Sequence, residues 1–153
     1  MQLLRSSLHP TPITPAFLAG SLALAVGGLL RLYCSLTLGK FWSFQLSVRK
    51  GHRLVTRGPY SVVRHPSYAA YLIQFVGLIA VSGSQGSWIR ESGVLHMRFA
   101  KVLAAIYFFL FTLGVFTGIR RVPLEDEMLH NALGEEWESW AKEVKYRLVP
   151  GVY

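Results

Sequence analysis

The stretch from His52 to Tyr68 holds the highest density of residues capable of chemistry, with two histidines, three arginines and two tyrosines. His65 precedes a proline, which disfavours helical backbone angles, and Pro66 suits the first position of a following helix. The start of such a helix has free backbone N–H groups that can bind a carboxylate or phosphate, and Arg64 adds positive charge there. The stretch therefore predicts an anion-binding pocket. The alternative is a basic loop whose tyrosines lie among lipid headgroups.

A second group, Arg120 to Glu127, places Arg121 four residues before Glu125. An arginine can hold a carboxylate, and a glutamate can accept hydrogen bonds from a ligand. The alternative is that the arginines contact phospholipid headgroups and that the acidic residues begin a helix, where its dipole stabilises negative charge. Pro123 lies between the two and predicts that any helix through this group is irregular.

Three hydrophobic segments must position these groups: residues 16–38, 66–82 and 102–119. A helix needs about 20 apolar residues to cross a bilayer, with a range of roughly 17–25. The chain is 52% hydrophobic and 16% charged, with a mean hydropathy of +0.35, which argues against an ordinary soluble enzyme and against a disordered chain. The sequence predicts an all-α fold: an integral membrane helical bundle with about three transmembrane helices. The alternative is a soluble helical core.

The distribution of positive charge predicts the orientation of these helices. The loop 39–65 carries six Lys and Arg residues, and the tail 120–153 carries five. Because Lys and Arg favour the cytosolic side, we expect both segments to face the cytosol and to meet on one face of the membrane. The net charge of +8 is then mainly a topology signal, and we expect no nucleic-acid partner. We treat residues 1–153 as a single membrane domain.

The tail predicts a helical segment at the membrane surface, and no fourth span. From Leu124 to Lys145 the acidic residues come early and the basic ones late, as a helix dipole favours. Trp137, Trp140 and Val144 follow a helical spacing and predict one stripe of a helix that lies against the membrane surface or the bundle. Gly134 is expected to divide the segment into two shorter helices.

Isolated residues carry weaker signals. Cys34 is the only cysteine, so neither an internal disulfide nor a thiolate metal site can be built. His9, His96 and His130 lack the spacing of metal ligands, and we expect no metal. Arg31 lies seven residues before the end of the first hydrophobic segment, and we expect its side chain to snorkel towards the headgroups.

The motifs resemble those of the isoprenylcysteine carboxyl methyltransferases. The resemblance runs from about Leu30 to the end, and it rests on the run His52-x-Leu54-Val55-Thr56-x-Gly58-Pro59-Tyr60-x-x-Val63-Arg64-His65-Pro66-Ser67-Tyr68. It continues in Arg121-x-Pro123-x-Glu125-Asp126, Gly134-Glu135-Glu136-Trp137 and Arg147-Leu148-Val149-Pro150. It implies a multi-pass enzyme of the endoplasmic reticulum membrane whose active site faces the cytosol. Such an enzyme uses S-adenosylmethionine to methylate the C-terminal carboxylate of prenylated cysteine, in processed CaaX proteins or small prenylcysteine substrates.

The resemblance also implies the site residues. Arg121 matches the arginine near the substrate carboxylate, and Glu125 matches a residue that holds the cofactor; we take both as catalytic candidates. The remaining cofactor-binding positions are Gln45, His52, Arg53, Leu54, Val55, Tyr60, His65, Pro66, Ser67 and Tyr68.

The expected reaction suits these residue types. An α-carboxylate has a pKa of about 3.5, so it is ionised at neutral pH and needs no general base. Catalysis then requires orientation and the exclusion of water. Arg121 is expected to hold one carboxylate oxygen while the other attacks the methyl group.

The chain also departs from the family pattern. Asp126 stands where a second glutamate is usual, Ala70 where glycine is common, and Leu133 where phenylalanine is usual. Family members commonly carry further N-terminal membrane helices, whereas this chain has three hydrophobic segments. The alternatives are methylation of another lipid acceptor such as phosphatidylethanolamine, reduction with NADPH as in sterol reductases, and an inactive relative that acts as a membrane scaffold.

Overall fold

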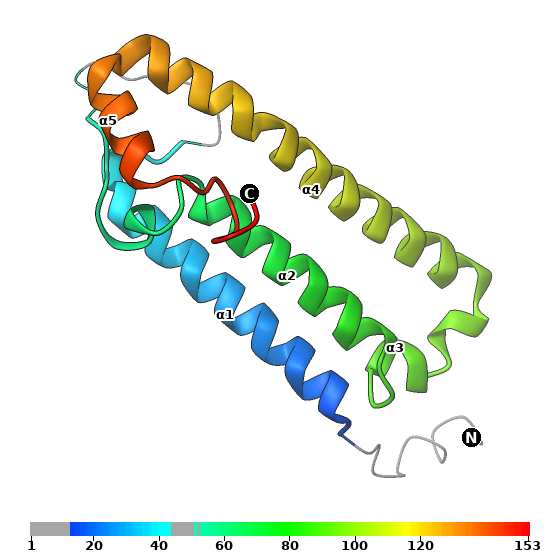
Figure 1. Cartoon of the computed structure of the whole chain (residues 1–153). Helices are drawn as coiled ribbons and strands as arrows, with labels where there is room; N and C mark the ends of the chain where they lie inside the picture. The colour runs from blue at the N-terminus through cyan, green and yellow to red at the C-terminus, as the bar shows by residue number, and fades with distance from the viewer. Residues whose placement is uncertain (1–12, 44–50, 52) are drawn as a thin grey trace.

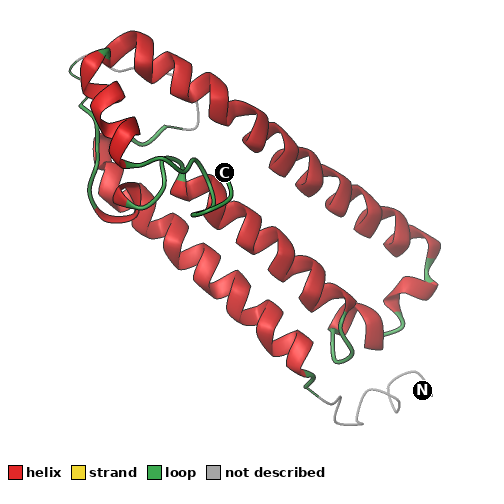
Figure 2. Ribbon diagram, in the orientation of Figure 1, coloured by secondary structure: helices red, strands yellow, loops and turns green. Residues whose placement is uncertain are grey.

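The computed structural model describes residues 13–43, 51 and 53–153, and every regular element in this part of the chain is a helix (Figure 2). The all-α prediction is therefore confirmed. Gln45 and His52, two of the predicted cofactor-binding residues, lie outside the described residues.

The first two predicted spans form as expected. Helix α1 runs from Pro15 to Leu38, and the hydroxyl of Thr14 accepts a hydrogen bond from Phe17 N at 3.2 Å at its start. Helix α2 runs from Pro66 to Gly83, with the proline at its first position. Two short 3₁₀ turns, η2 (Gly39–Phe41) and η3 (Gly58–Ser61), lie in the connection between α1 and α2.

Helices α1 and α2 are antiparallel and meet along a seam of small residues (Figure 1). Gly20, Gly27 and Cys34 are buried on α1 at seven-residue intervals, and Gly20 faces Gly77 of α2 while Gly27 faces Ala70. A Cβ on Gly27 would lie 2.8 Å from the Ala70 carbonyl oxygen, and one on Gly77 would lie 2.8 Å from the Gly20 carbonyl oxygen. Only glycine permits such a close approach of two backbones in a membrane bundle. Glycine on α1 therefore makes room for Ala70 on α2.

After α2 the chain turns through helix α3 (Trp88–Glu91) and the 3₁₀ turn η4 (Val94–His96) into helix α4, which spans Arg98–Leu133. Helix α4 contains the third predicted span, 102–119, and continues through Pro123 without a break. Pro123 therefore does not end the helix.

The packing around Pro123 explains why the helix continues. A proline in a helix interior costs a backbone hydrogen bond and adds a steric clash. Val122 is fully buried and Asp126 is 4% exposed, so side chains on both flanks of the proline are fixed by tertiary contacts. These contacts hold the helix in spite of the local penalty.

Helix α5 (Glu135–Glu143) follows α4 after Gly134, which has a φ of 53°. Glycine tolerates this left-handed backbone without a Cβ clash, so the predicted break at Gly134 is confirmed. The first part of the predicted tail helix is, however, the last part of α4.

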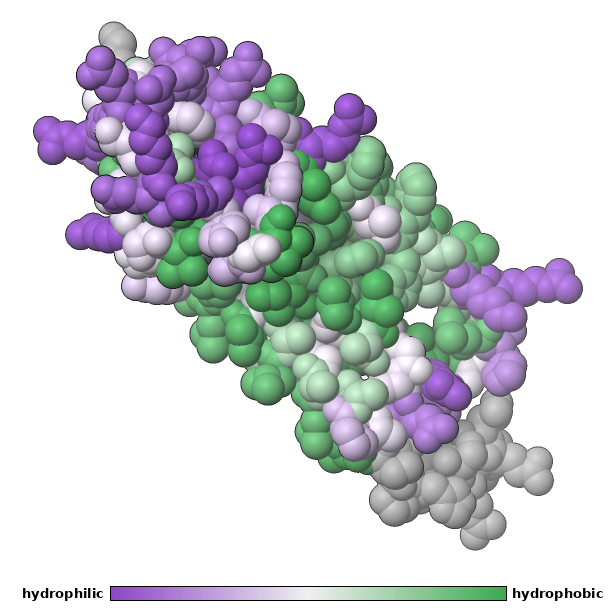
Figure 3. Space-filling model, viewed as in Figure 1, coloured by the Kyte–Doolittle hydropathy of each residue, from purple (hydrophilic) through white to green (hydrophobic). Residues whose placement is uncertain are grey.

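The chain is a multi-pass membrane protein. Three helical stretches are long and apolar enough to cross a bilayer, namely 15–41, 66–91 and 98–133. Their outer faces are covered by exposed apolar side chains, as on Leu22, Leu29 and Phe109, which are each about two-thirds exposed. Figure 3 shows the resulting apolar surface along the bundle, with hydrophilic residues gathered at both ends.

Helix α4 packs on α2 less closely than α1 does. The contact runs through aromatic rings: Phe111 lies 5.1 Å from the Tyr71 ring and is stacked on Phe75 at 5.7 Å between ring centroids. About two turns further along α4, Gly118 faces the ring of Tyr68. The end of α4, helix α5 and the start of α2 meet at one end of the bundle, as the charge pattern predicts for residues 39–65 and 120–153 (Figure 1).

Candidate active site

Asp126 is the centre of an ion network that joins three segments of the chain. Its Oδ1 lies 2.8 Å from Nε2 of His65, and its Oδ2 lies 3.0 Å from Nη1 of Arg64 and 3.0 Å from Nε of Arg147. Asp126 is 4% exposed, so this one carboxylate ties the start of α2 and the C-terminal segment to α4 in a site with little water.

The network fixes how His65 presents its ring. A carboxylate only accepts hydrogen bonds, so Nε2 of His65 carries the proton in its bond to Asp126. Nδ1 then faces Glu125, whose Oε2 lies 4.0 Å away. Glu125 also accepts a hydrogen bond from the Tyr68 hydroxyl at 3.0 Å. The two predicted groups, 52–68 and 120–127, are thus joined by adjacent carboxylates of α4.

The C-terminal segment closes over the loop that precedes α2. Arg64 N donates to Tyr146 O at 2.9 Å, His65 N donates to Arg147 O at 2.8 Å, and Trp140 Nε1 donates to Tyr60 O at 3.3 Å. These three bonds fix α5 and the residues that follow it against the loop that precedes α2.

The tryptophan stripe of the tail lies at the same place. Trp140 and Val144 are buried, and the guanidinium of Arg64 lies 5.6 Å from the half-buried Trp137 ring. The predicted stripe is therefore confirmed, and it packs against the protein's own loop.

These bonds correct one expectation. The start of α2 was expected to offer several free N–H groups to an anion, but those of Arg64 and His65 are bonded to the C-terminal segment. The N–H groups of Tyr68 and Ala69 are bonded to the His65 carbonyl, at 3.1 and 3.2 Å. Pro66 has none. Ser67 lines the cavity and its N–H takes part in none of these bonds, so an anion at this end of the bundle could use that one N–H and would otherwise be held by side chains.

A cavity of about 280 Å³ opens beside the network, between α1, α2, α4 and α5. Its size is at the lower end of the range for small-molecule sites. Eight predicted site residues contribute to its wall: Leu54, Val55, Tyr60, His65, Ser67, Tyr68, Arg121 and Glu125.

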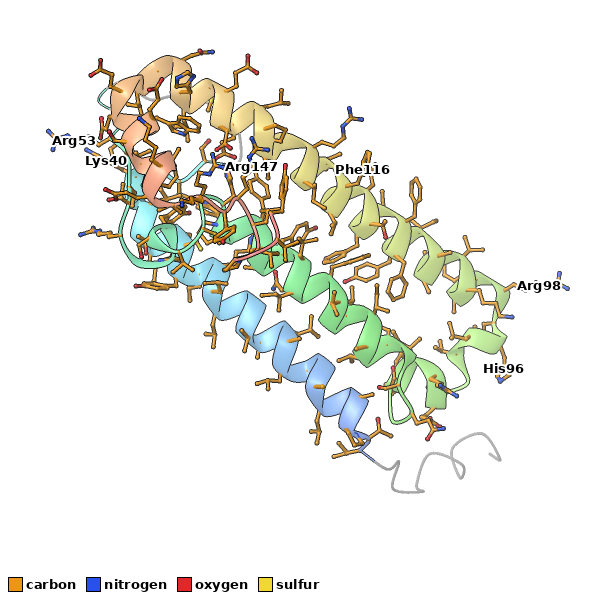
Figure 4. The ribbon with its side chains drawn as sticks, in the orientation of Figure 1. Lys40, Arg53, His96, Arg98, Phe116 and Arg147 are labelled. Carbon is orange, nitrogen blue, oxygen red and sulfur yellow. The ribbon has the colours of Figure 1, made fainter. Side chains whose placement is uncertain are left out.

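Two predicted residues lie elsewhere. Arg53 is exposed and points away from the bundle (Figure 4). Pro66 is almost fully buried in the packing at the start of α2 and is not part of the cavity wall. Neither is placed to contact a ligand in the cavity.

Two groups beside the cavity have shifted acidity. Burial is the main effect that raises the pKa of Tyr60, so this residue presents a neutral hydroxyl at physiological pH. Burial also lowers the pKa of the Arg64 guanidinium, although Asp126 acts in the opposite direction. Arginine remains charged despite such a shift, so the ion pair with Asp126 is retained.

The sequence analysis assigned no role in the site to four residues that shape it. Asp126 and Arg147 belong to the ion network, and Tyr71 and Arg31 belong to the cavity wall. The guanidinium of Arg31 lies 5.1 Å from the centroid of the Tyr71 ring. For Arg31, its charge inside a hydrophobic span was the one signal in the sequence that pointed to a role in the site.

Comparison with known proteins supports the motif assignment. Residues 20–85 match the isoprenylcysteine carboxyl methyltransferase (ICMT) family, and this match confirms the resemblance. It covers most of α1, the loop and α2, and it ends before α4. The chain is 27% identical over 127 residues to protein-S-isoprenylcysteine O-methyltransferase B of Arabidopsis thaliana, which covers 82% of this chain and 55% of that protein.

Other relatives have different names. The cobalt-zinc-cadmium resistance protein CzcN of Cupriavidus metallidurans is 38% identical over 71 residues, covering 46% of this chain and 31% of that protein. The Delta(14)-sterol reductase ERG24A of Gibberella zeae is 28% identical over 123 residues, covering 71% of this chain and 25% of that protein. The chain thus spans about half the length of its methyltransferase relatives and less of the others. No solved structure matches the chain.

Proposed function

We propose that this chain, whose residues 20–85 match the isoprenylcysteine carboxyl methyltransferase family, transfers a methyl group from S-adenosylmethionine to the C-terminal carboxylate of a prenylated cysteine. The observation that carries the proposal is the common cavity. Residues of both motif groups line it, and the Tyr68–Glu125 hydrogen bond at 3.0 Å joins them.

The residues around the cavity are of the types that S-adenosylmethionine requires. Glu125 offers a carboxylate to a positively charged ligand, and the hydroxyl groups of Tyr60 and Tyr68 offer further polar contacts. Trp42 and Trp140 provide aromatic surface for a purine ring. When bound, S-adenosylmethionine supplies an electrophilic methyl group on a sulfonium.

In the proposed mechanism the chain orients the acceptor and excludes water. The acceptor carboxylate is already ionised at neutral pH, so no residue has to remove a proton from it. Arg121 would hold one carboxylate oxygen and leave the other free to accept the methyl group that bound S-adenosylmethionine would supply. Glu125, one helical turn further along α4, would place a carboxylate beside the positive charge of the bound cofactor.

An amine acceptor such as phosphatidylethanolamine makes a further demand on the site. An amine must lose a proton during attack, so a base is needed near Arg121. Of the two candidates, His130 is bonded to Glu138 at 3.0 Å and is absent from the cavity wall. His65, the other, donates its Nε2 proton to Asp126 and keeps the lone pair of Nδ1, which is the arrangement of a general base, so methylation of an amine is the second candidate function.

The proposal includes the location and the partners. A multi-pass protein with this reaction would work in the endoplasmic reticulum membrane, with the end that carries α5 in the cytosol. Its partners would be the bilayer and prenylated CaaX-type proteins or small prenylcysteine substrates.

Calorimetric titration of the purified protein in detergent tests the reaction class. Methyl transfer predicts binding of S-adenosylhomocysteine and none of NADPH. Binding of NADPH alone would favour reduction, and binding of neither would favour a membrane scaffold. The variant Arg121→Ala should lower methyl transfer to N-acetyl-S-farnesylcysteine by about 100-fold, as expected for loss of a positioning contact. Unchanged turnover would refute the role of Arg121.

A further inference from the structure

The connection between α2 and α4 lies at the end of the bundle opposite α5, and its charge is unexpected there (Figure 1). Residues 84–101, which include α3, η4 and the first turn of α4, carry three basic residues, Arg90, Arg98 and Lys101, and one acidic residue, Glu91. Lys and Arg concentrate on the cytosolic side of membrane proteins, and the proposed orientation places α5 on that side. The topology of the chain therefore does not explain these basic residues.

Local contacts do not neutralise this charge either. The Glu91 carboxylate accepts a hydrogen bond from Gly86 N at 3.2 Å, and Arg90 donates to the carbonyl oxygen of the last residue of α2 at 3.0 Å. None of the ion pairs between described residues includes Arg90, Arg98 or Lys101. Arg98 and Lys101 are exposed in the first turn of α4, where the helix dipole disfavours positive charge, so helix formation gives no reason for them.

Large apolar side chains of the same stretch face outward. Trp88, Phe99 and Met97 are 72%, 71% and 61% exposed. Tryptophan is enriched where the apolar core of a bilayer meets the headgroups, because its ring is apolar and its N–H is polar. Figure 4 shows the side chains of His96 and Arg98 directed away from the bundle at this end. The stretch therefore combines aromatic rings suited to the membrane interface with positive charge beside them.

We propose that residues 88–101 bind the headgroup of an anionic phospholipid in the leaflet opposite α5. Arg98 and Lys101 are three residues apart on one face of α4, so both reach one phosphate. Trp88 and Phe99 contact the acyl chains next to that headgroup. The charge of the stretch is complementary to an anionic headgroup, whereas a zwitterionic headgroup has no net charge to attract. None of these residues lines the cavity, so the inference holds whether or not the proposed reaction is correct.

Binding of two lipids to the purified protein in detergent tests the proposal. The lipids are phosphatidylglycerol, which is anionic, and phosphatidylcholine with the same acyl chains, and native mass spectrometry measures how much of each is bound. The wild-type chain should bind phosphatidylglycerol more tightly. The double variant Arg98→Gln/Lys101→Gln should weaken this binding by at least about fivefold, the contribution of one basic residue near an anionic lipid surface. Its affinity for phosphatidylcholine should not change.

Two control variants separate the surface from the overall charge. Arg57→Gln/Lys145→Gln removes the same charge from exposed positions at the end that carries α5, and Arg98→Lys/Lys101→Arg keeps the charge in place. Both should retain the wild-type preference for phosphatidylglycerol. An equal loss in the Arg57/Lys145 variant, or no loss in Arg98→Gln/Lys101→Gln, would refute the proposal. Displacement of the lipid by an equal concentration of inorganic phosphate would assign the surface to free phosphate and refute it as well.

Tryptophan fluorescence locates the bound lipid. Phosphatidylglycerol with brominated acyl chains quenches the tryptophans that it contacts, and Trp88 is the most exposed of the described tryptophans. Trp88→Phe should remove most of the quenching, and Arg98→Gln/Lys101→Gln should reduce it. Quenching that persists in both variants would place the lipid elsewhere and overturn the proposal. Size-exclusion profiles and circular dichroism of each variant show that the fold is retained.

Discussion

The α1–α2 seam and the junction between α4 and the rest of the bundle are held by different forces. The seam consists of small apolar residues whose backbones nearly touch, as at Gly27 and Ala70. The junction consists of aromatic contacts along α2 and an ion network around Asp126. A seam of this kind excludes every ligand, because a single added Cβ would clash.

The difference explains where the cavity lies. Large aromatic and charged side chains keep α4 at a distance from α2 at the end that carries α5, and the cavity occupies the resulting space. The seam provides a rigid pair of helices, while the junction presents charged groups at fixed positions. The candidate site therefore depends on electrostatic anchoring more than on close packing.

The largest effect is expected from Asp126→Ala. This change leaves His65, Arg64 and Arg147 without their shared carboxylate, and breaking a buried ion pair costs about 3–5 kcal/mol. The apparent melting temperature in detergent should fall strongly, and methyl transfer should be lost. Glu127→Ala is the matched control, since Glu127 is exposed on the same turn. Equal losses in both variants would show that the junction does not depend on Asp126.

A smaller effect is expected at the seam, from Gly27→Ala. The added Cβ would lie 2.5 Å from Cγ of Gln74, and overpacking of this kind costs about 1–3 kcal/mol. Gly28→Ala is the control, because its Cβ would meet only Nε2 of Gln74, at 3.6 Å. Both changes gain the same helix propensity, so the difference in melting temperature isolates the clash. Equal stability of the two variants would mean that the seam is looser than described.

Gly118→Ala should lower the rate of methyl transfer without unfolding the protein. Its Cβ would lie 3.3 Å from the Tyr68 ring, so the ring must shift by a few tenths of an ångström. A misplacement of 1 Å in an active site costs about 100-fold, so this shift should lower methyl transfer by no more than about tenfold. Gly83→Ala, with no atom within 4 Å of its Cβ, should leave the rate unchanged. A fall in melting temperature with no change in rate would contradict the placement of Tyr68 in the site.

The smallest effect is expected at an exposed ion pair of the same end of the molecule. The hydrogen bond with His130 is the main cause that lowers the pKa of Glu138 from its ordinary value of 4.5. Any stabilisation from this pair is present above that value and is lost as the pH falls through the lowered pKa. Because both side chains are about half exposed, Glu138→Gln should leave the melting temperature at pH 7 unchanged. A clear fall would mean that α5 is anchored to α4 by charge as well as by the buried Trp140.

The membrane spans could be predicted from the sequence because length and hydropathy are local properties. The bounds of α1 and α2 differ from the predicted ones by a single residue. The regular helix through Pro123 could not be predicted, since it depends on the burial of Val122 and Asp126. Helix propensity describes the cost of a proline in a helix but does not include the tertiary contacts of the residues beside it.

The site shows the same division between local and long-range information. The motifs led to Tyr68, Arg121 and Glu125, which the fold brings into one cavity. They missed Asp126 as the centre of the network, because its partners lie about 60 residues away, or at the C-terminus. The predicted free N–H groups of α2 failed for a related reason: the C-terminal segment returns to bond with them. Nothing in the local sequence indicates that contact.

The most direct test of the account is a methyl-transfer assay with labelled S-adenosylmethionine and two acceptors. One is N-acetyl-S-farnesylcysteine, and the other is an S-farnesyl analogue that lacks the carboxylate. The account predicts label on the first acceptor, as a base-labile methyl ester, and none on the second. Equal labelling of both acceptors, or labelling of neither by folded protein, would contradict carboxylate methylation as the function of this cavity.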